Sequence, residues 1–138
     1  MEIFPFGEED VFALSKLLQY ESAERGKAGG GMTETLMRAV RSEEVRFFIV
    51  KEGDFPVGFS AFTLRYDYAL GNRVATLEHL YLMPDFRGKG YGKAILSYVE
   101  NAARYYGATA LQIRGEENKM QAFGFIPTTE TVYKKNLT

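Results

Sequence analysis

Three glycines and three cations lie within the short stretch PDFRGKGYGKA, residues 84–94. An apolar run, TLEHLYLM, directly precedes it, and a run with helical spacing, ILSYVENAARYY, directly follows it. A strand that enters a helix through Gly88, Gly90 and Gly92 exposes free N–H donors at the positive end of that helix. Glycine also lets the backbone approach a ligand closely, because it has no Cβ. The stretch therefore predicts a strand–turn–helix unit that binds a phosphate or pyrophosphate, the alternative being a glycine-rich turn with solvated cations.

The rest of the chain alternates between strand and helix patterns. The predicted strands are residues 2–6, 45–53, 56–70, 73–83, 108–114 and 132–137. The predicted helices are residues 7–22, residues 33–42 and a third that follows the glycines and ends near Gly107. Antiparallel hairpins followed by one strand–helix–strand crossover predict an α/β fold, with a mixed, mostly antiparallel twisted sheet and helices on both faces.

Composition limits the classes of function. A length of 138 residues predicts a single domain, 1–138, and a net charge of −1 argues against a general nucleic-acid binder. Neither a membrane-spanning run nor a signal peptide is present, so we expect a cytoplasmic protein without a membrane partner. The absence of cysteine excludes disulfides and thiolate catalysis, and a single histidine gives little support for a metal site.

The glycine stretch can be compared with common phosphate-binding motifs. A P-loop, G-x-x-x-x-G-K-[ST], fails at its first and last positions, which Arg87 and Ala94 occupy. A dinucleotide fingerprint, G-x-G-x-x-G, fails because Lys93 stands where the third glycine is required. The pattern that fits is R-x-x-G-x-G, which Arg87, Gly90 and Gly92 complete.

In its context, LEHLYLMPDFRGKGYGKAILSYVEN, this pattern closely resembles the acetyl-CoA-binding segment of the GNAT N-acetyltransferase superfamily. The resemblance extends to EIFPFGEEDVFAL near the start and AFGF near the end, so it covers most of the chain. It implies a GNAT-like fold, acetyl-CoA as co-substrate, and a cofactor-binding set that includes the main chain of the apolar strand beside the pantetheine arm. That set is Leu80, Tyr81, Leu82, Arg87, Gly88, Lys89, Gly90, Tyr91, Gly92, Lys93 and Asn118.

Direct acetyl transfer to an amine needs a base, since an amine with a pKa of about 10.4 is almost fully protonated at neutral pH. The resemblance favours Glu78, which we expect to be buried where this strand and strand 108–114 separate, because a buried carboxyl is a stronger base. The alternative is a structural glutamate paired across the sheet with Arg65 or Arg73. His79, which we expect on the opposite strand face, is a second candidate for a base or relay.

One position departs from the family pattern. The family usually has a tyrosine as general acid four residues before its Gly-Phe pair, but this chain has Met120 there. The general acid is therefore unassigned, with Tyr105, Tyr106 and Tyr133 as substitutes that are more typical of a core.

The resemblance predicts an N-acetyltransferase that acts on a primary amine of a small molecule or peptide by direct transfer. The alternatives are a catalytically idle acyl-CoA-binding module on the same fold and a structural domain without a ligand. Glu21 and Glu24 can attract a cationic amine or form a solvated helix end, and Tyr66, Asp67 and Tyr68 lie near a hairpin end. The acceptor, the acyl length and the oligomeric state stay open, with a homodimer as one alternative.

Overall fold

The computed structural model describes residues 1–26, 34–113, 124–128 and 133–137, and these form one five-stranded sheet with three α-helices. The strand order is β1-β2-β3-β4-β5. Each neighbouring pair among β1 to β4 is antiparallel, and β5 runs parallel to β4. The strands are β1 Glu2–Pro5, β2 Val45–Glu52, β3 Phe55–Asp67, β4 Asn72–Leu82 and β5 Ala108–Ile113. The helices are α1 Val11–Glu24, α2 Glu34–Arg41 and α3 Tyr91–Tyr105, with 3₁₀ turns η1 Glu8–Asp10 and η2 Pro84–Phe86.

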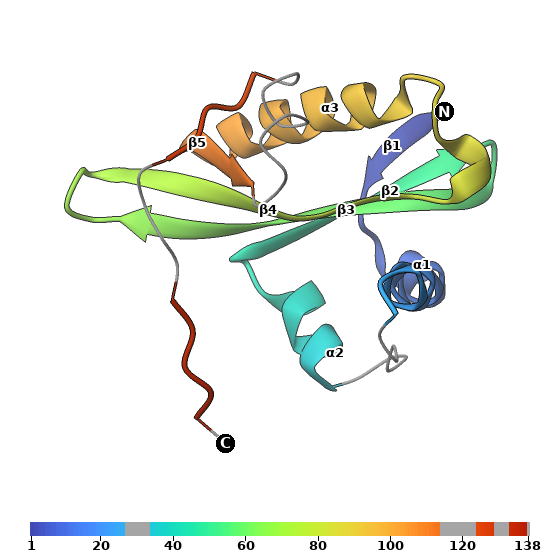
Figure 1. Ribbon diagram of the computed structural model, residues 1–138, viewed down its shortest axis with the longest axis horizontal. Helices are drawn as coiled ribbons and strands as arrows, with labels where there is room; N and C mark the ends of the chain where they lie inside the picture. Colours follow the sequence, from blue (N-terminus) through green and yellow to red (C-terminus); the bar gives the residue numbers. More distant parts are fainter. Residues whose placement is uncertain (27–33, 114–123, 129–132, 138) are drawn as a thin grey trace.

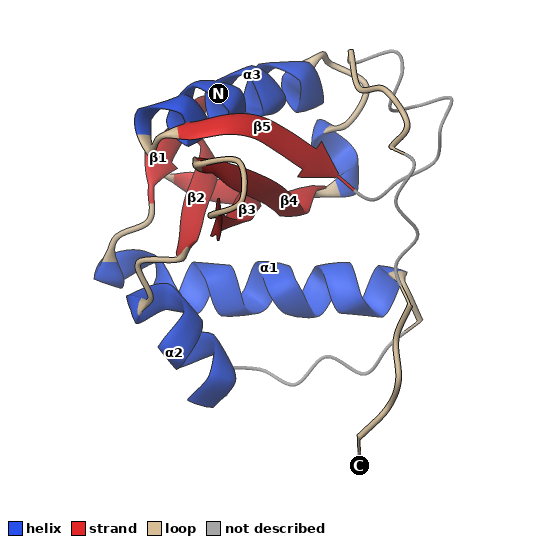
Figure 2. Ribbon diagram, turned by 90° about the vertical axis from the view of Figure 1, so that its left-hand side faces the viewer, coloured by secondary structure: helices blue, strands red, loops and turns tan. Residues whose placement is uncertain are grey.

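Helices cover both faces of the sheet, with α3 on one face and α1 and α2 on the other (Figures 1 and 2). Two buried clusters result, one on each face. The α3-side core is Phe48, Val50, Val57, Phe62, Leu64, Ala75, Leu77, Leu82, Ile95, Leu96, Val99, Ala103 and Ala108. The α1-side core is Leu14, Leu17, Ile49, Phe59 and Tyr81. The predicted mixed sheet with helices on both faces is confirmed.

The predicted strand at residues 132–137 is wrong, because its described part, residues 133–137, is not in a strand. A strand needs a partner for its backbone and a surface for its apolar side chains. Tyr133 and Leu137 are instead almost fully exposed. Thr33, where we expected the second helix to begin, lies outside the described residues.

None of the described helices has the length and apolar character required to cross a membrane.

Strand β4 carries one extra residue in its ladder with β3. Ala61 pairs with His79 and Phe62 pairs with Leu77, so Glu78 has no residue opposite it and forms a β-bulge. The parallel ladder with β5 ends at Leu77, opposite Ile113. Among the described residues, positions 78–82 of β4 therefore have no partner in β5. Residues 114–123, which would continue β5 beside the bulge, lie outside the described residues, so the predicted separation of these two strands stays a prediction.

The β3–β4 ladder requires a glycine opposite the end of β4. Gly58 is buried and pairs with Leu82. A Cβ at position 58 would lie 2.3 Å from the backbone oxygen of Tyr81, far inside van der Waals contact. Two backbones can approach this closely only where a side chain is absent.

We expect Gly58→Ala to lower the free energy of unfolding by about 1–3 kcal/mol, because the strands must separate to admit the methyl group. Urea denaturation measures the change. Gly92→Ala is the control, since nothing lies within 4 Å of a Cβ at that position and its stability should be equal or slightly higher. Equal stabilities for the Gly58 variant and wild type would contradict the claim that β3 and β4 require a glycine at position 58.

Candidate functional site

The glycine-rich stretch forms a tight connection between β4 and α3. The short turn η2 is closed by hydrogen bonds from the N–H of Phe86 to the carbonyl of Met83 (3.0 Å) and from the N–H of Arg87 to that of Pro84 (3.2 Å). Gly88 and Gly90 then take positive φ values of 76° and 80°, which strain any other residue. Gly90 is the N-cap of α3, so the chain enters the helix through a left-handed residue.

The amides of this connection face open space. The first backbone hydrogen bond into α3 runs from the N–H of Ala94 to the carbonyl of Gly90, at 3.3 Å. Within the described part of the chain, no group accepts a hydrogen bond from the N–H groups of residues 88–93. A Cβ built at Gly88, Gly90 or Gly92 would meet nothing within 4 Å. Unpaired donors at the positive end of a helix suit an anion, so these residues fit a diphosphate.

Arg87, which we expected to contact the cofactor, directs its side chain toward the protein. Its Nε donates to the carbonyl of Leu82 at 2.8 Å, and its Nη2 donates to both carboxylate oxygens of Glu24, at 3.0 and 2.8 Å. Its guanidinium carbon lies 5.5 Å from the centre of the Tyr81 ring. The guanidinium therefore joins the end of α1 to the connection before α3.

Tyr81 takes part in the same contacts. Its side chain is 5% exposed within the α1-side core, and its hydroxyl donates to Glu24 at 2.9 Å. Burial, together with that hydrogen bond to the carboxylate, raises the pKa of Tyr81 to about 12. The hydrogen bond from Arg87 and then that from Tyr81 lower the pKa of Glu24. The Tyr81 side chain therefore belongs to the core, and only its main chain lies along the open edge of β4.

The other predicted cofactor residues differ in exposure. Leu80 is 36% exposed on the open part of β4, and Leu82 is buried. Tyr91 packs against the α3-side core. The Nζ of Lys89 lies 5.6 Å from the centre of the Phe86 ring, and Lys93 is exposed. Asn118 and Met120 lie outside the described residues.

Glu78, the predicted base, occupies the bulge and is exposed, so the expectation that it is buried is wrong. Its Oε1 accepts a hydrogen bond from Thr63 at 3.1 Å. Arg73 donates instead to the carbonyl of Tyr106, and no described contact joins Glu78 to Arg65. The bulge exposes this carboxylate because its strand position has no partner residue.

The expectation that His79 faces away from Glu78 is also wrong. Thr63 lies between two residues of the α3-side core, Phe62 and Leu64, so its side chain points toward the opposite face, where α1 lies. Glu78 bonds Thr63 on that face, and His79 contacts α1 there. Consecutive residues in a bulge oppose a single partner residue, which explains why both side chains lie on the same face.

The histidine has a buried carboxylate as its partner. Its Nδ1 lies 2.7 Å from Oε1 of Glu21, which is 6% exposed, and its ring packs on Phe59 with 5.2 Å between centres. Arg25 lies 3.7 Å from the other carboxylate oxygen of Glu21.

From the sequence, Glu21 and Glu24 are either a pair that attracts a cationic amine or a solvated helix end. The second interpretation is wrong for Glu21, which is buried, and the first stays a prediction. Each carboxylate binds a side chain from across the sheet. A sequence signal was available, because Leu14, Leu17, Glu21 and Glu24 follow one another at helical three- and four-residue spacing. Glu21 thus continues the buried stripe of α1, and Glu24 lies at its exposed end.

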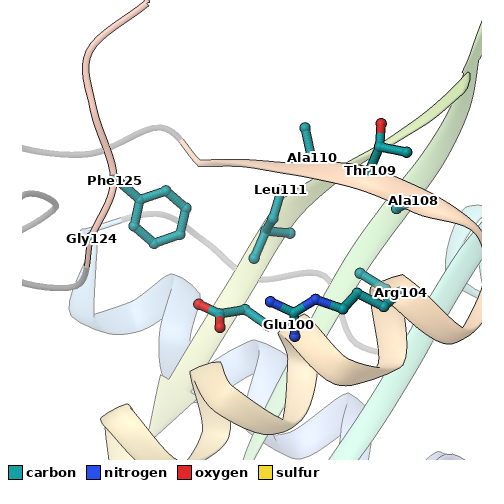
Figure 3. A pocket seen from close by; sticks show the side chains of 9 residues that line it. Glu100, Arg104, Ala108, Thr109, Ala110, Leu111, Gly124 and Phe125 are labelled. Carbon is teal, nitrogen blue, oxygen red and sulfur yellow. The ribbon is translucent and has the colours of Figure 1, made fainter.

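A cavity of about 470 Å³ lies elsewhere, between the second half of α3, β5 and Gly124–Phe125. Glu100 and Arg104 from α3 and Leu111 from β5 line it (Figure 3). None of the predicted site residues lines this cavity, which is distant along α3 from the glycines. Among the described residues, no three His, Asp or Glu side chains form a group that could hold a metal ion.

Comparison with known proteins identifies the family. Residues 14–126 match the Acetyltransferase (GNAT) family. Two similar curated proteins are both named Aminoglycoside N(6')-acetyltransferase type 1. The one from Acinetobacter genomosp. 13 is 34% identical over 82 residues, which span 53% of this chain and 56% of that protein. The one from Stenotrophomonas maltophilia is 31% identical over 110 residues, which span 72% of each.

A solved structure described as a probable acetyltransferase has the same fold, with a TM-score of 0.87 at 17% identity. The match covers 100% of this chain and 99% of that one. At this identity the likeness concerns the fold alone, and it agrees with the sheet order and helix placement described above. The family match covers most of the length, and the R-x-x-G-x-G segment forms the open connection expected of it. This chain belongs to the GNAT acetyltransferase family.

Proposed function

We propose that this chain is an acetyl-CoA-dependent N-acetyltransferase that moves the acetyl group directly to a primary amine. The observation that best supports this proposal is that the N–H groups of residues 88–93 have no acceptor among the described residues. These residues lie in the R-x-x-G-x-G segment of a chain that matches the GNAT family. The diphosphate of acetyl-CoA would lie on these amides, and Lys89 and Lys93 add positive charge nearby. The relatives, which are named acetyltransferases, support this class of enzyme.

The open edge of β4 supports the position of the rest of acetyl-CoA. Residues 78–82 have no partner in β5 among the described residues, so main-chain groups along this edge are free to bind an extended chain of amides. Leu80 is the half-exposed side chain on this edge. The pantetheine arm would lie here, and the thioester, which supplies the activated acetyl group, would come close to the bulge at Glu78.

For the acceptor we infer an amine that approaches from the α1 face. Three carboxylates gather around the bulge and the end of α1: Glu78 is exposed, and Glu21 and Glu24 have protein partners. Negative charge near a site raises the local concentration of a cationic amine. Because both curated relatives bear the name of aminoglycoside acetyltransferases, an aminoglycoside is the first acceptor to test.

We infer that Arg87 acts by holding the connection in place. Its Nη2 contacts both carboxylate oxygens of Glu24 and its Nε donates to the carbonyl of Leu82, so these two nitrogens are directed toward the protein. Binding of the diphosphate would then depend on the main-chain amides and on Lys89 and Lys93.

A thiol-release assay tests the proposed function. Wild type is mixed with acetyl-CoA and a panel of amines that includes an aminoglycoside, a polyamine, an amino acid and a peptide with a free N-terminus. We expect amine-dependent release of CoA thiol and an acceptor product heavier by one acetyl group. Calorimetric binding of acetyl-CoA with no release for any amine would support the non-catalytic alternative. Neither binding nor release would contradict the proposal.

We expect Gly92→Ala to weaken acetyl-CoA binding by about tenfold or more, which corresponds to about 1.4 kcal/mol. The physical reason is that a methyl group beside the free amides keeps the diphosphate from close approach. Isothermal calorimetry measures the affinity, and a thermal melt verifies that the variant is folded, because a Cβ at this position has open space. Ser97→Ala, an exposed position farther along α3, is the matched control. Unchanged affinity in the Gly92 variant would place the diphosphate elsewhere.

The contact between Glu24 and Arg87 predicts a pH-dependent stability. Because folding lowers the pKa of Glu24 below its ordinary value of 4.5, its contribution is fully present above that pH. The contribution is lost as the pH falls through the lowered pKa. We therefore expect the difference in unfolding free energy between wild type and Glu24→Gln to be constant between about pH 5 and 8 and to shrink in more acidic solution.

Urea denaturation at several pH values measures that difference. Glu34→Gln is the control, because Glu34 and its partner Arg38 are about 80% exposed and such pairs contribute little. A difference that stays constant into strongly acidic solution would show that the carboxylate of Glu24 does not stabilise the fold through its charge.

A further inference from the structure

We propose that His79 is the proton acceptor of the transfer reaction and that Glu21 is the residue that positions it. This inference rests on the proposed function and assigns the base within it. The two residues lie 58 positions apart in the sequence, and the fold brings Nδ1 of the imidazole within 2.7 Å of a carboxylate oxygen.

The first support is the burial of Glu21. A carboxylate that is 6% exposed costs free energy unless charged or polar partners satisfy it. Its partners in the described structure are His79 and, at 3.7 Å, Arg25. Such a carboxylate accepts the Nδ1 proton of the ring, and the proton then sits on the side of the imidazole that faces α1. Nε2 is left with its lone pair, as a base requires.

The second support is the rigid placement of the ring. Ser60, which is fully buried, donates its hydroxyl to the carbonyl of His79 at 2.7 Å and fixes the main chain. Phe59 packs against the imidazole, and Glu21 holds Nδ1. The side chain of His79 is still 29% exposed, so part of the ring reaches solvent. Among the described residues, none forms a hydrogen bond with Nε2.

The third support is the position of His79 in the chain. It follows the bulged residue, beyond the last described pair of β4 with β5, and the proposed function places the thioester close to this bulge. Imidazole is the side chain whose ordinary pKa falls between pH 5 and 8, where a base works efficiently at neutral pH. Glu78, exposed beside it, offers negative charge to a cationic acceptor.

The proposed step conserves atoms and protons. The amine nitrogen attacks the thioester carbonyl, so that the C–N bond forms and the C–S bond breaks. One N–H proton of the amine passes to Nε2 of His79, and the imidazolium is stabilised by Glu21. The thiolate takes that proton from Nε2, which leaves an N-acetylated amine, CoA thiol and neutral imidazole.

The ring tautomer can be measured directly, because His79 is the single histidine of the chain. We expect ¹⁵N NMR of wild type near pH 8 to show the proton on Nδ1. Glu21→Leu removes the acceptor and should shift the proton toward Nε2, whereas Glu21→Gln keeps an acceptor oxygen and should retain more of the Nδ1 form. Glu24→Gln, at a carboxylate on the same helix without a bond to His79, should match wild type. A wild-type proton on Nε2 would overturn the inference.

Steady-state kinetics with the best amine of the panel test the role itself. We expect His79→Gln to lower kcat by about 10²–10³-fold. Its KM for acetyl-CoA should stay within about twofold of wild type, because the substitution changes only the side chain and leaves the main-chain groups of β4 and the amides of residues 88–93 in place. Glu21→Leu should lower kcat by a similar factor, Glu21→Gln by less, and the double variant His79→Gln/Glu21→Leu no further than His79→Gln alone. Glu78→Gln should cost less than His79→Gln.

Thermal melts and acetyl-CoA calorimetry establish that each variant is folded and binds the co-substrate. An active wild type whose His79→Gln variant keeps more than half of its kcat would overturn the assignment of His79 and leave the proposed function intact. A greater loss in Glu78→Gln than in His79→Gln would assign the base to Glu78. An inactive wild type on every amine would overturn both proposals.

Discussion

The extra residue in β4 determines how the site is arranged. A strand in a regular ladder must alternate its side chains between the two faces of the sheet. Because Glu78 has no partner in β3, that alternation is interrupted, and two consecutive polar side chains face α1. Among the described residues, the ladder of this strand with β5 also ends directly before the bulge, at Leu77. The bulge at Glu78 therefore lies beside the part of β4 that has no described partner in β5, and it places two polar side chains, Glu78 and His79, on the α1 face.

Helix α1 packs against β4 through polar as well as apolar contacts. Leu14 and Leu17 pack in the core, and the next two positions of the same stripe, Glu21 and Glu24, reach His79 and the Arg87–Tyr81 pair. Burying the carboxylate of Glu21 is unfavourable unless its partners are in place, so this contact favours one register of the helix along the sheet. The contacts link α1 to β4 and to the connection between β4 and α3.

Local patterns in the sequence predicted most of the fold and the glycine-rich connection between β4 and α3. The glycines at positions 88, 90 and 92 determine the turn by their own backbone freedom, and apolar periodicity locates each helix and most strands. The prediction of a strand at residues 132–137 failed because a strand forms only beside a sheet edge, and no local pattern shows where such an edge lies. The contacts of Glu21 with His79 and of Glu24 with Arg87 span 58 and 63 positions. Only the folded chain brings such pairs together, and a one-residue bulge has no marker in composition.

Because the side chain of Arg87 already binds Glu24 and the carbonyl of Leu82, affinity for a diphosphate would arise mainly from the other groups of the connection. A guanidinium already paired with a carboxylate contributes little net charge to its surroundings, so selectivity would come mainly from the geometry of backbone amides. Amides fixed by a left-handed N-cap do not need to be reorganised when a ligand binds, whereas flexible lysines lose side-chain entropy. A rigid connection held by the contact between Arg87 and Glu24 would therefore contribute more to diphosphate affinity than one additional mobile cation. In this chain the arginine of the motif therefore has a structural role as well as a charge, because it secures the connection that carries the glycines.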